Sequence, residues 1–83
     1  MKHARSDYQR IQDPANLIPA DEPVFLLRAK DEVAPLTVER WAALAEQAGA
    51  DHAIVKAARD QAASMRRWQR EHGCQIPDMP AQC

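Results

Sequence analysis

Apolar residues recur at helical spacing in two stretches in the middle of the 83-residue chain. In the first stretch, residues three or four positions apart are apolar, with Leu44 beside them: Val38, Trp41, Ala42, Ala45 and Ala48. Thr37 precedes this stretch as a candidate N-cap, and Gly49 follows it as a candidate left-handed C-cap. The pattern predicts an amphipathic helix between these two residues.

The second stretch has the same spacing, with Val55 beside the apolar positions Ile54, Ala58, Ala62, Met65 and Trp68. Asp51 is its candidate N-cap, and the helix should run toward His72 and stop at Gly73. Only three residues, Gly49 to Asp51, link the two stretches. Such a short link predicts an antiparallel helical hairpin.

The core of this hairpin is predicted from the largest apolar residues on the two faces. They are Val38, Trp41, Leu44, Ile54, Met65 and Trp68. Trp41 comes early in the first helix and Trp68 late in the second, so antiparallel packing should bring them to the same end of the hairpin. Phe25 is a candidate to lie between them.

Residues 23–30 are the one good strand candidate, because β-branched and aromatic residues begin the segment and acidic pairs bound it. A single strand leaves its own backbone groups unpaired. The segment should therefore pair with residues 8–12, pair with a second copy of the chain, or form a short helix instead.

The flanking segments contain most of the prolines, which break helices. We therefore expect an extended arm over 1–22, a helical core over 23–72 that begins with one short strand or helix, and a proline-containing tail over 73–83. The predicted class is mainly α, an antiparallel two-helix hairpin with an extended N-terminal arm.

Alanine changes the picture of the core. Sixteen residues are alanine, and ten of them lie between Ala42 and Ala63. Small residues favour close contact between helices, but they bury little surface. The hairpin alone is therefore expected to be too thin, so that flanking segments or a second chain must complete its core.

The formal net charge is −1, which favours no class of partner, but the charges are unevenly distributed. Residues 11–53 carry eight acids against three bases, and residues 54–72 carry five bases against two acids. The bases fall on the side of the second helix opposite its predicted apolar face: Lys56, Arg59, Arg66, Arg67 and Arg70. Such a basic face could bind the phosphates of a nucleic acid. The favoured interpretation is that it is exposed to solvent and that some of its bases pair with acids of residues 11–53.

The sequence contains few residues that could form a catalytic site or a metal site. His72, Cys74 and Cys83 form the one His/Cys cluster, and no fourth ligand accompanies them. We predict no metal, no cofactor, no catalytic residue and no enzymatic activity. The cysteines are expected to be free thiols, with a Cys74–Cys83 disulfide as the alternative. No membrane span and no secretory signal is predicted, so a cytoplasmic protein is expected.

Three segments of the sequence resemble a known group of proteins. They are Tyr-Gln-Arg-Ile-Gln-Asp-Pro at 8–14, Ile-Pro-Ala-Asp-Glu-Pro-Val-Phe-Leu-Leu-Arg-Ala-Lys-Asp at 18–31, and Arg-Arg-Trp-Gln-Arg-Glu at 66–71. With Trp41, these segments resemble small uncharacterised proteins encoded by bacteriophages and prophages. The resemblance implies an accessory protein that acts in the bacterial host cell by binding a host protein, such as a CRISPR–Cas defence complex. It implies no catalytic motif.

The predicted function is therefore protein binding, with inhibition of a host defence complex as its specific form. The predicted partner-binding residues are Tyr8, Arg10, Phe25, Arg28, Arg66, Arg67 and Arg70. Residues 24–27 also form a candidate edge for a partner or for a homodimer. The alternatives are a nucleic-acid-binding accessory protein that uses the basic helix face, and a homo-oligomeric structural or assembly protein.

Overall fold

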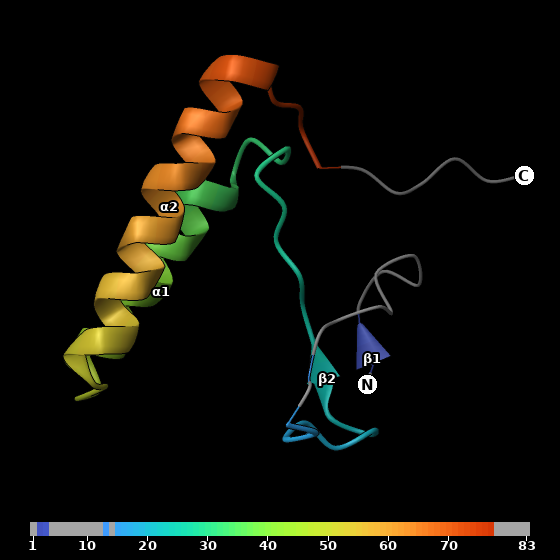
Figure 1. The fold of residues 1–83 in the computed structure, drawn as a ribbon, viewed down its shortest axis with the longest axis vertical. Coiled ribbons are helices and arrows are strands. Elements are labelled where there is room, and N and C mark those ends of the chain that lie inside the picture. Colours follow the sequence, from blue (N-terminus) through green and yellow to red (C-terminus); the bar gives the residue numbers. More distant parts are fainter. Residues whose placement is uncertain (1, 4–12, 14, 78–83) are drawn as a thin grey trace, which may run out of the picture. The chain divides into compact units, whose positions relative to one another are not determined.

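The computed structural model describes residues 2–3, 13 and 15–77 (Figure 1). Along the chain it contains strand β1 (Lys2–His3), strand β2 (Pro23–Val24), helix α1 (Ala34–Gln47) and helix α2 (His52–His72). The helices pack against each other, so the predicted mainly helical class and helical hairpin are confirmed. Two compact units are distinguished: the described residues up to Leu26 belong to one, and Leu27–Pro77 form the other.

The strand predicted over 23–30 is much shorter than expected. β2 contains only Pro23 and Val24, and it pairs in parallel with β1 through the partners Lys2–Pro23 and His3–Val24. Residues 28–31 form a turn in which the Asp31 N–H donates to the Arg28 carbonyl at 3.0 Å. Residues 8–12, the predicted pairing partner, lie outside the described part of the chain, and 23–30 does not form a helix.

α1 begins one turn earlier than predicted, at Ala34. Pro35 lies in the first turn, where a backbone N–H is not needed for the helix, so the helix starts ahead of it. Thr37 is therefore not the N-cap residue. Its hydroxyl donates to the carbonyl of Val33 at 2.8 Å, and its N–H donates to the same carbonyl at 3.1 Å.

The turn between the helices follows the sequence prediction. Gly49 adopts φ +88°, a left-handed conformation that glycine accepts without strain from a side chain. Its N–H donates to the Glu46 carbonyl at 3.1 Å, and the Ala50 N–H donates to the Ala45 carbonyl at 2.9 Å. These two bonds form a Schellman motif, which ends α1 sharply.

The ends of α2 were also predicted correctly. The Asp51 side chain accepts a hydrogen bond from the Ala53 N–H at 2.7 Å, as an N-cap residue does. At the other end, Gly73 has φ +81°, and its N–H donates to the Gln69 carbonyl at 2.7 Å. Local interactions therefore define both ends of this helix, through a side chain at Asp51 and through the backbone at Gly73.

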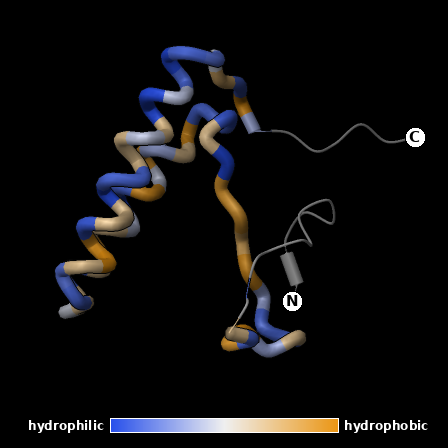
Figure 2. The backbone as a smooth tube through the Cα atoms, viewed as in Figure 1, coloured by the Kyte–Doolittle hydropathy of each residue, from blue (hydrophilic) through white to orange (hydrophobic). Residues whose placement is uncertain are grey.

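The core between the helices is made of small and medium-sized side chains. Hydrophobic and hydrophilic residues alternate along both helices (Figure 2). The buried apolar residues are Ala34, Pro35, Ala42, Val55, Ala62 and Met65. Ala42 and Ala62 are completely buried, with 0% exposure. Among the buried and half-buried positions, one line on each helix has a coiled-coil-like spacing of three and four residues: 35, 38, 42 and 45 on α1, and 55, 58, 62 and 65 on α2.

The assignment to the core is wrong for four of the six predicted residues. Met65 is buried and Val38 half-buried, but Trp41 is 50% exposed, Leu44 48%, Ile54 49% and Trp68 38%. Contact along a line of small residues leaves no room for these large side chains, so they lie at the edges or on the outside of the hairpin. Because Ala42 faces α2, the neighbouring residue Trp41 points away from α2.

The Glu39–Arg66 pair places Trp41 and Trp68 toward the same end of the hairpin, as predicted, but within the described residues their rings make no contact with each other. The ring of Trp68 stacks on His72 with centroids 4.4 Å apart and an interplanar angle of 17°. Trp41 has no ring contact within the described residues and lines the outer side of α1. Phe25 belongs to the other unit and is 66% exposed.

Two ion pairs join the two helices of the hairpin. Glu39 on α1 pairs with Arg66 on α2, and Glu46 pairs with Arg59. The two acids are seven residues apart, and so are the two bases. Seven residues are about two helical turns. The pairs therefore repeat along one edge of an antiparallel contact.

Chain segments before α1 and after α2 are tied to the end of α2. The Gln69 side-chain amide donates to the carbonyls of Ala29 at 2.8 Å and Asp31 at 3.0 Å. Gln75 continues this contact, because its N–H donates to the Lys30 carbonyl at 2.9 Å and its carbonyl accepts from the Glu32 N–H at 2.7 Å. The start of the tail thus belongs to the same unit as the hairpin.

Candidate functional site

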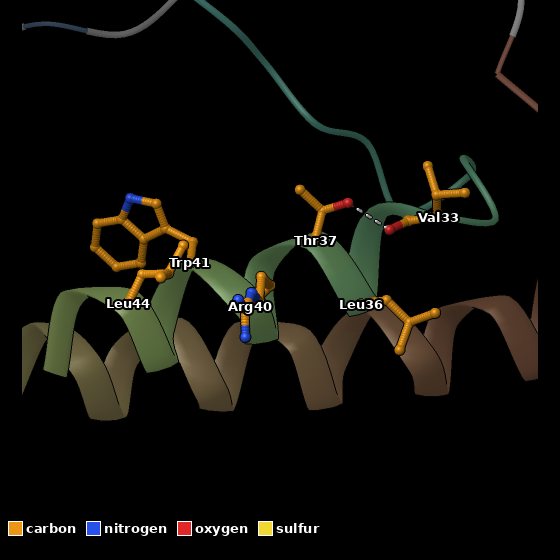
Figure 3. Close-up of a pocket in the computed structure, with 6 residues that line it drawn as sticks. All are labelled: Val33, Leu36, Thr37, Arg40, Trp41 and Leu44. Atoms are coloured by element: carbon orange, nitrogen blue, oxygen red, sulfur yellow. Dashed lines mark hydrogen bonds between the residues drawn. The ribbon is translucent and has the colours of Figure 1, made fainter. Parts of the chain in front are cut away.

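The outer side of α1 carries a hollow lined by apolar side chains (Figure 3). Its six lining residues are Val33, Leu36, Thr37, Arg40, Trp41 and Leu44, which we call the outer face of α1. They lie three or four residues apart, so they share one side of the helix, away from the buried Ala42. In Figure 3, Trp41 and Leu44 lie at one end, Leu36 and Val33 at the other, and Arg40 between them.

Large apolar side chains dominate this face. Leu36 is 64% exposed and Val33 48%, in addition to the half-exposed Trp41 and Leu44. Single exposed apolar residues are common on proteins, but contiguous apolar patches with polar residues around them mark sites of interaction. The face therefore has the composition of a contact surface.

Polar groups on the face are limited to Thr37 and Arg40. The Thr37 hydroxyl donates to the Val33 carbonyl. Arg40 is exposed and has no ion-pair partner in the part of the chain that the structure describes. The nearby acids Glu39 and Glu46 already pair with arginines of α2. Arg40 is thus an unpaired cation in the middle of an apolar surface.

The predicted partner-binding residues fall in both units and in the part of the chain that the structure does not describe. Tyr8 and Arg10 lie outside the described residues. Phe25 is exposed in one unit and Arg28 is exposed in the other. On α2, Arg66 is half-buried and paired with Glu39, Arg67 donates to the Ser64 hydroxyl at 3.2 Å, and Arg70 is exposed in the last turn.

The basic side of α2 is largely neutralised by ion pairs. Lys56 pairs with Asp60 at 2.6 Å, one turn along the same helix. Arg59 and Arg66 pair with acids of α1. The interpretation that this side partly pairs with the acidic segment of the chain is therefore confirmed.

The Glu46–Arg59 pair affects the titration of its carboxylate. The two guanidinium nitrogens of Arg59 lie 3.3 and 3.4 Å from the two carboxylate oxygens. This hydrogen bonding, and then the positive charge of Arg59, lowers the pKa of Glu46 below its ordinary value of 4.5. A carboxyl whose pKa is lowered by folding stabilises the folded state while it is ionised.

Glu46→Gln should therefore lower the melting temperature at pH 7, and the difference from the unsubstituted chain should vanish in acid. The contribution of Glu46 is fully present above 4.5, the ordinary pKa, and is lost as the pH falls through the lowered pKa of the folded chain. Melting followed by circular dichroism from pH 7 to pH 2 measures this. Glu71→Gln, at an exposed position of α2, is the matched control. A difference for Glu46→Gln that persists unchanged in acid would contradict the assigned pair.

A second hollow lies at the C-terminal end of α2. It is lined by Lys30, Trp68, His72, Gly73, Cys74 and Gln75. Cys74 is exposed and carries a free thiol, whereas Cys83 lies outside the described residues. The described residues contain no group of three or more His, Cys, Asp or Glu side chains placed to hold a metal ion. Neither described helix has the length and apolar character needed to cross a membrane.

Three residues of the outer face of α1, Val33, Leu36 and Arg40, were not singled out from the sequence. Trp41 and Leu44 were predicted as core residues. The signal was present as a second set of apolar residues that fall on one side of a helix: Val33, Leu36, Trp41 and Leu44. It was hidden because a helix start at Thr37 leaves Val33 and Leu36 outside the helix.

No protein-family model, curated protein sequence or solved structure matches this chain. The function must therefore be argued from the surface itself.

Proposed function

We propose that this chain is a small non-enzymatic protein-binding module, and that a partner protein packs on the outer face of α1. The observation that carries the proposal is the placement of Leu36, Trp41 and Leu44, three large apolar residues, on the exposed side of a helix whose other side is buried. Their exposure is costly unless a partner covers them. Tryptophan is also enriched among the residues that dominate binding energy at interfaces.

A small-molecule site fits the geometry less well. Pockets for small ligands enclose most of the ligand surface. The hollow on α1 is lined by one helix and the residue before it, and therefore lies open along its length. A second protein covers such a surface better than a small ligand.

Nucleic acid is also the weaker alternative. Lysine and arginine side chains that neutralise phosphates supply most of the affinity for nucleic acid. On α2, the side chains of Lys56, Arg59 and Arg66 are held by acids of the same chain. The formal net charge of −1 adds no general attraction for a polyanion.

The class of the partner stays a prediction. The resemblance to phage and prophage proteins points to a host protein, and a defence complex such as CRISPR–Cas is the specific form of that prediction. A bacterial lysate contains such candidates, so a capture experiment can identify the partner and test the surface at the same time.

Leu36→Lys should abolish capture of the partner. The substitution places a charge on the outer face, where burial without a counter-ion costs well over the 1.4 kcal/mol that corresponds to a tenfold loss of affinity. The full-length chain, the variant and a control are used as baits in bacterial lysate, and bound proteins are quantified by mass spectrometry. Gln61→Lys adds the same charge at an exposed position of α2 and is the control.

The proposal predicts at least one host protein that the unsubstituted chain and Gln61→Lys retain and that Leu36→Lys loses by tenfold or more. Circular dichroism of each bait establishes that the helices are intact. If Leu36→Lys retains the same proteins in the same amounts, the outer face of α1 is not the binding surface.

A further inference from the structure

The outer face of α1 has the form of a helix–helix contact. Its residues span positions 33 to 44, roughly 16 Å along the helix axis. They form ridges three and four residues apart, and a second helix packs best against such ridges. An amphipathic helix that lays its apolar side on a hydrophobic surface is a common mode of peptide recognition.

The charge on this face restricts what that helix can carry. Arg40 lies near the middle of the face, and none of the six lining residues is acidic. A partner that covers Leu36 and Trp41 also removes water from around the guanidinium group between them. A buried cation without a partner is strongly unfavourable, whereas an arginine–carboxylate pair is among the strongest hydrogen-bonded contacts.

Two outer faces of α1 packed against each other do not supply the missing carboxylate, because none of the six residues that line the face is acidic. Two-fold pairing places the same surface on both sides of the interface. Because Arg40 lies near the centre of the face, a parallel or antiparallel pairing of two outer faces brings two Arg40 side chains within roughly one helical turn of each other. Like charges placed together in an interface are unfavourable.

We infer that the segment covering the outer face of α1 is an amphipathic helix of another protein, with a glutamate or aspartate in its apolar stripe that pairs with Arg40. This inference rests on the proposed function and names the chemistry of the partner. The apolar residues of the face supply contact area, and Arg40 selects for acidic partners.

A pair of synthetic peptides tests the inference on the full-length chain. Both are labelled amphipathic helices of 18 residues with the same leucine stripe. One has glutamate in the middle of the stripe and the other has lysine. Fluorescence anisotropy measures their affinities. The glutamate peptide should bind at least tenfold more tightly than the lysine peptide, as expected for a charge-assisted contact against a like-charge contact.

Substitutions at Arg40 make the test specific. Arg40→Gln should remove the preference, and Arg40→Glu should reverse it. Lys56→Glu makes the same charge change at an exposed position of α2 and should leave the preference intact. Equal binding of the two peptides, binding of neither, or a preference that survives Arg40→Gln would each overturn the inference.

Two further outcomes separate this inference from the proposed function. If both peptides bind equally and Leu36→Lys weakens both, the outer face is a binding surface, but Arg40 does not select its partner. If the chain sediments as a dimer that Leu36→Lys converts to a monomer, a second copy covers the face and the inference falls.

Discussion

Replacing Ala62 with leucine should destabilise the hairpin by about 1–3 kcal/mol, although the substitution adds apolar surface to a helix. Ala62 on α2 and Ala42 on α1 are both completely buried. Their small side chains allow the helices to approach closely, and a leucine at this point must push the helices apart or adopt a strained rotamer. Either response weakens the packing of Val55 and Met65, the largest side chains buried on α2.

The matched control is Ala63→Leu. Ala63 is the next residue of the same helix and is exposed, so both variants have the same composition and the same change in helix propensity. Ala63→Leu should change the free energy of unfolding by less than about 0.5 kcal/mol. Urea unfolding followed by circular dichroism compares the two. Equal stability of the two variants would mean that the hairpin does not pack through its alanines.

The ends of the helices were largely predictable because they depend on local chemistry. Gly49 and Asp51 act through hydrogen bonds to residues within a few positions in the sequence. A glycine that ends one helix and an aspartate that begins the next therefore define the hairpin turn without any knowledge of its core. The start of α1 was not predictable in the same way, because Val33 at the N-cap position has no capping side chain.

The rotation of α1 was not predicted, because both sides of the helix are apolar. The choice between them was made by size, which placed Trp41 inside. Packing density decides otherwise, since a pair of helices in contact through alanine has no volume for an indole ring. Glu39 and Glu46 are seven residues apart, and so are Arg59 and Arg66. This shared spacing indicates that the charged residues of α1 lie beside its contact with α2, so that the buried residues of α1 lie between these charges and its outer face.

The candidate site was missed for the same reason. The sequence prediction places Trp41 and Leu44 in the core together with the alanines, whereas the structure buries Ala42 and leaves the two large residues exposed. Arg40 had no signal of its own in the sequence, because its importance depends on the apolar residues that surround it and on the acids that are already paired elsewhere.

Trp41 should be accessible to solvent in the folded chain, in spite of its place in an apolar pattern. Half of its surface is exposed, and it lies on the side of α1 away from α2. In a Trp68→Phe background it is the sole tryptophan, and phenylalanine retains a ring that can stack on His72. Its fluorescence then reports directly on which side of α1 is exposed to solvent.

Collisional quenching of Trp41 by acrylamide in the Trp68→Phe chain is the most direct test that α1 buries its alanines and presents its large apolar residues outward. The account predicts emission at long wavelength and a quenching constant approaching that of the chain unfolded in urea. A blue-shifted emission with a quenching constant several-fold lower than in urea would place Trp41 in the core and contradict both the rotation of α1 and the binding surface built on it.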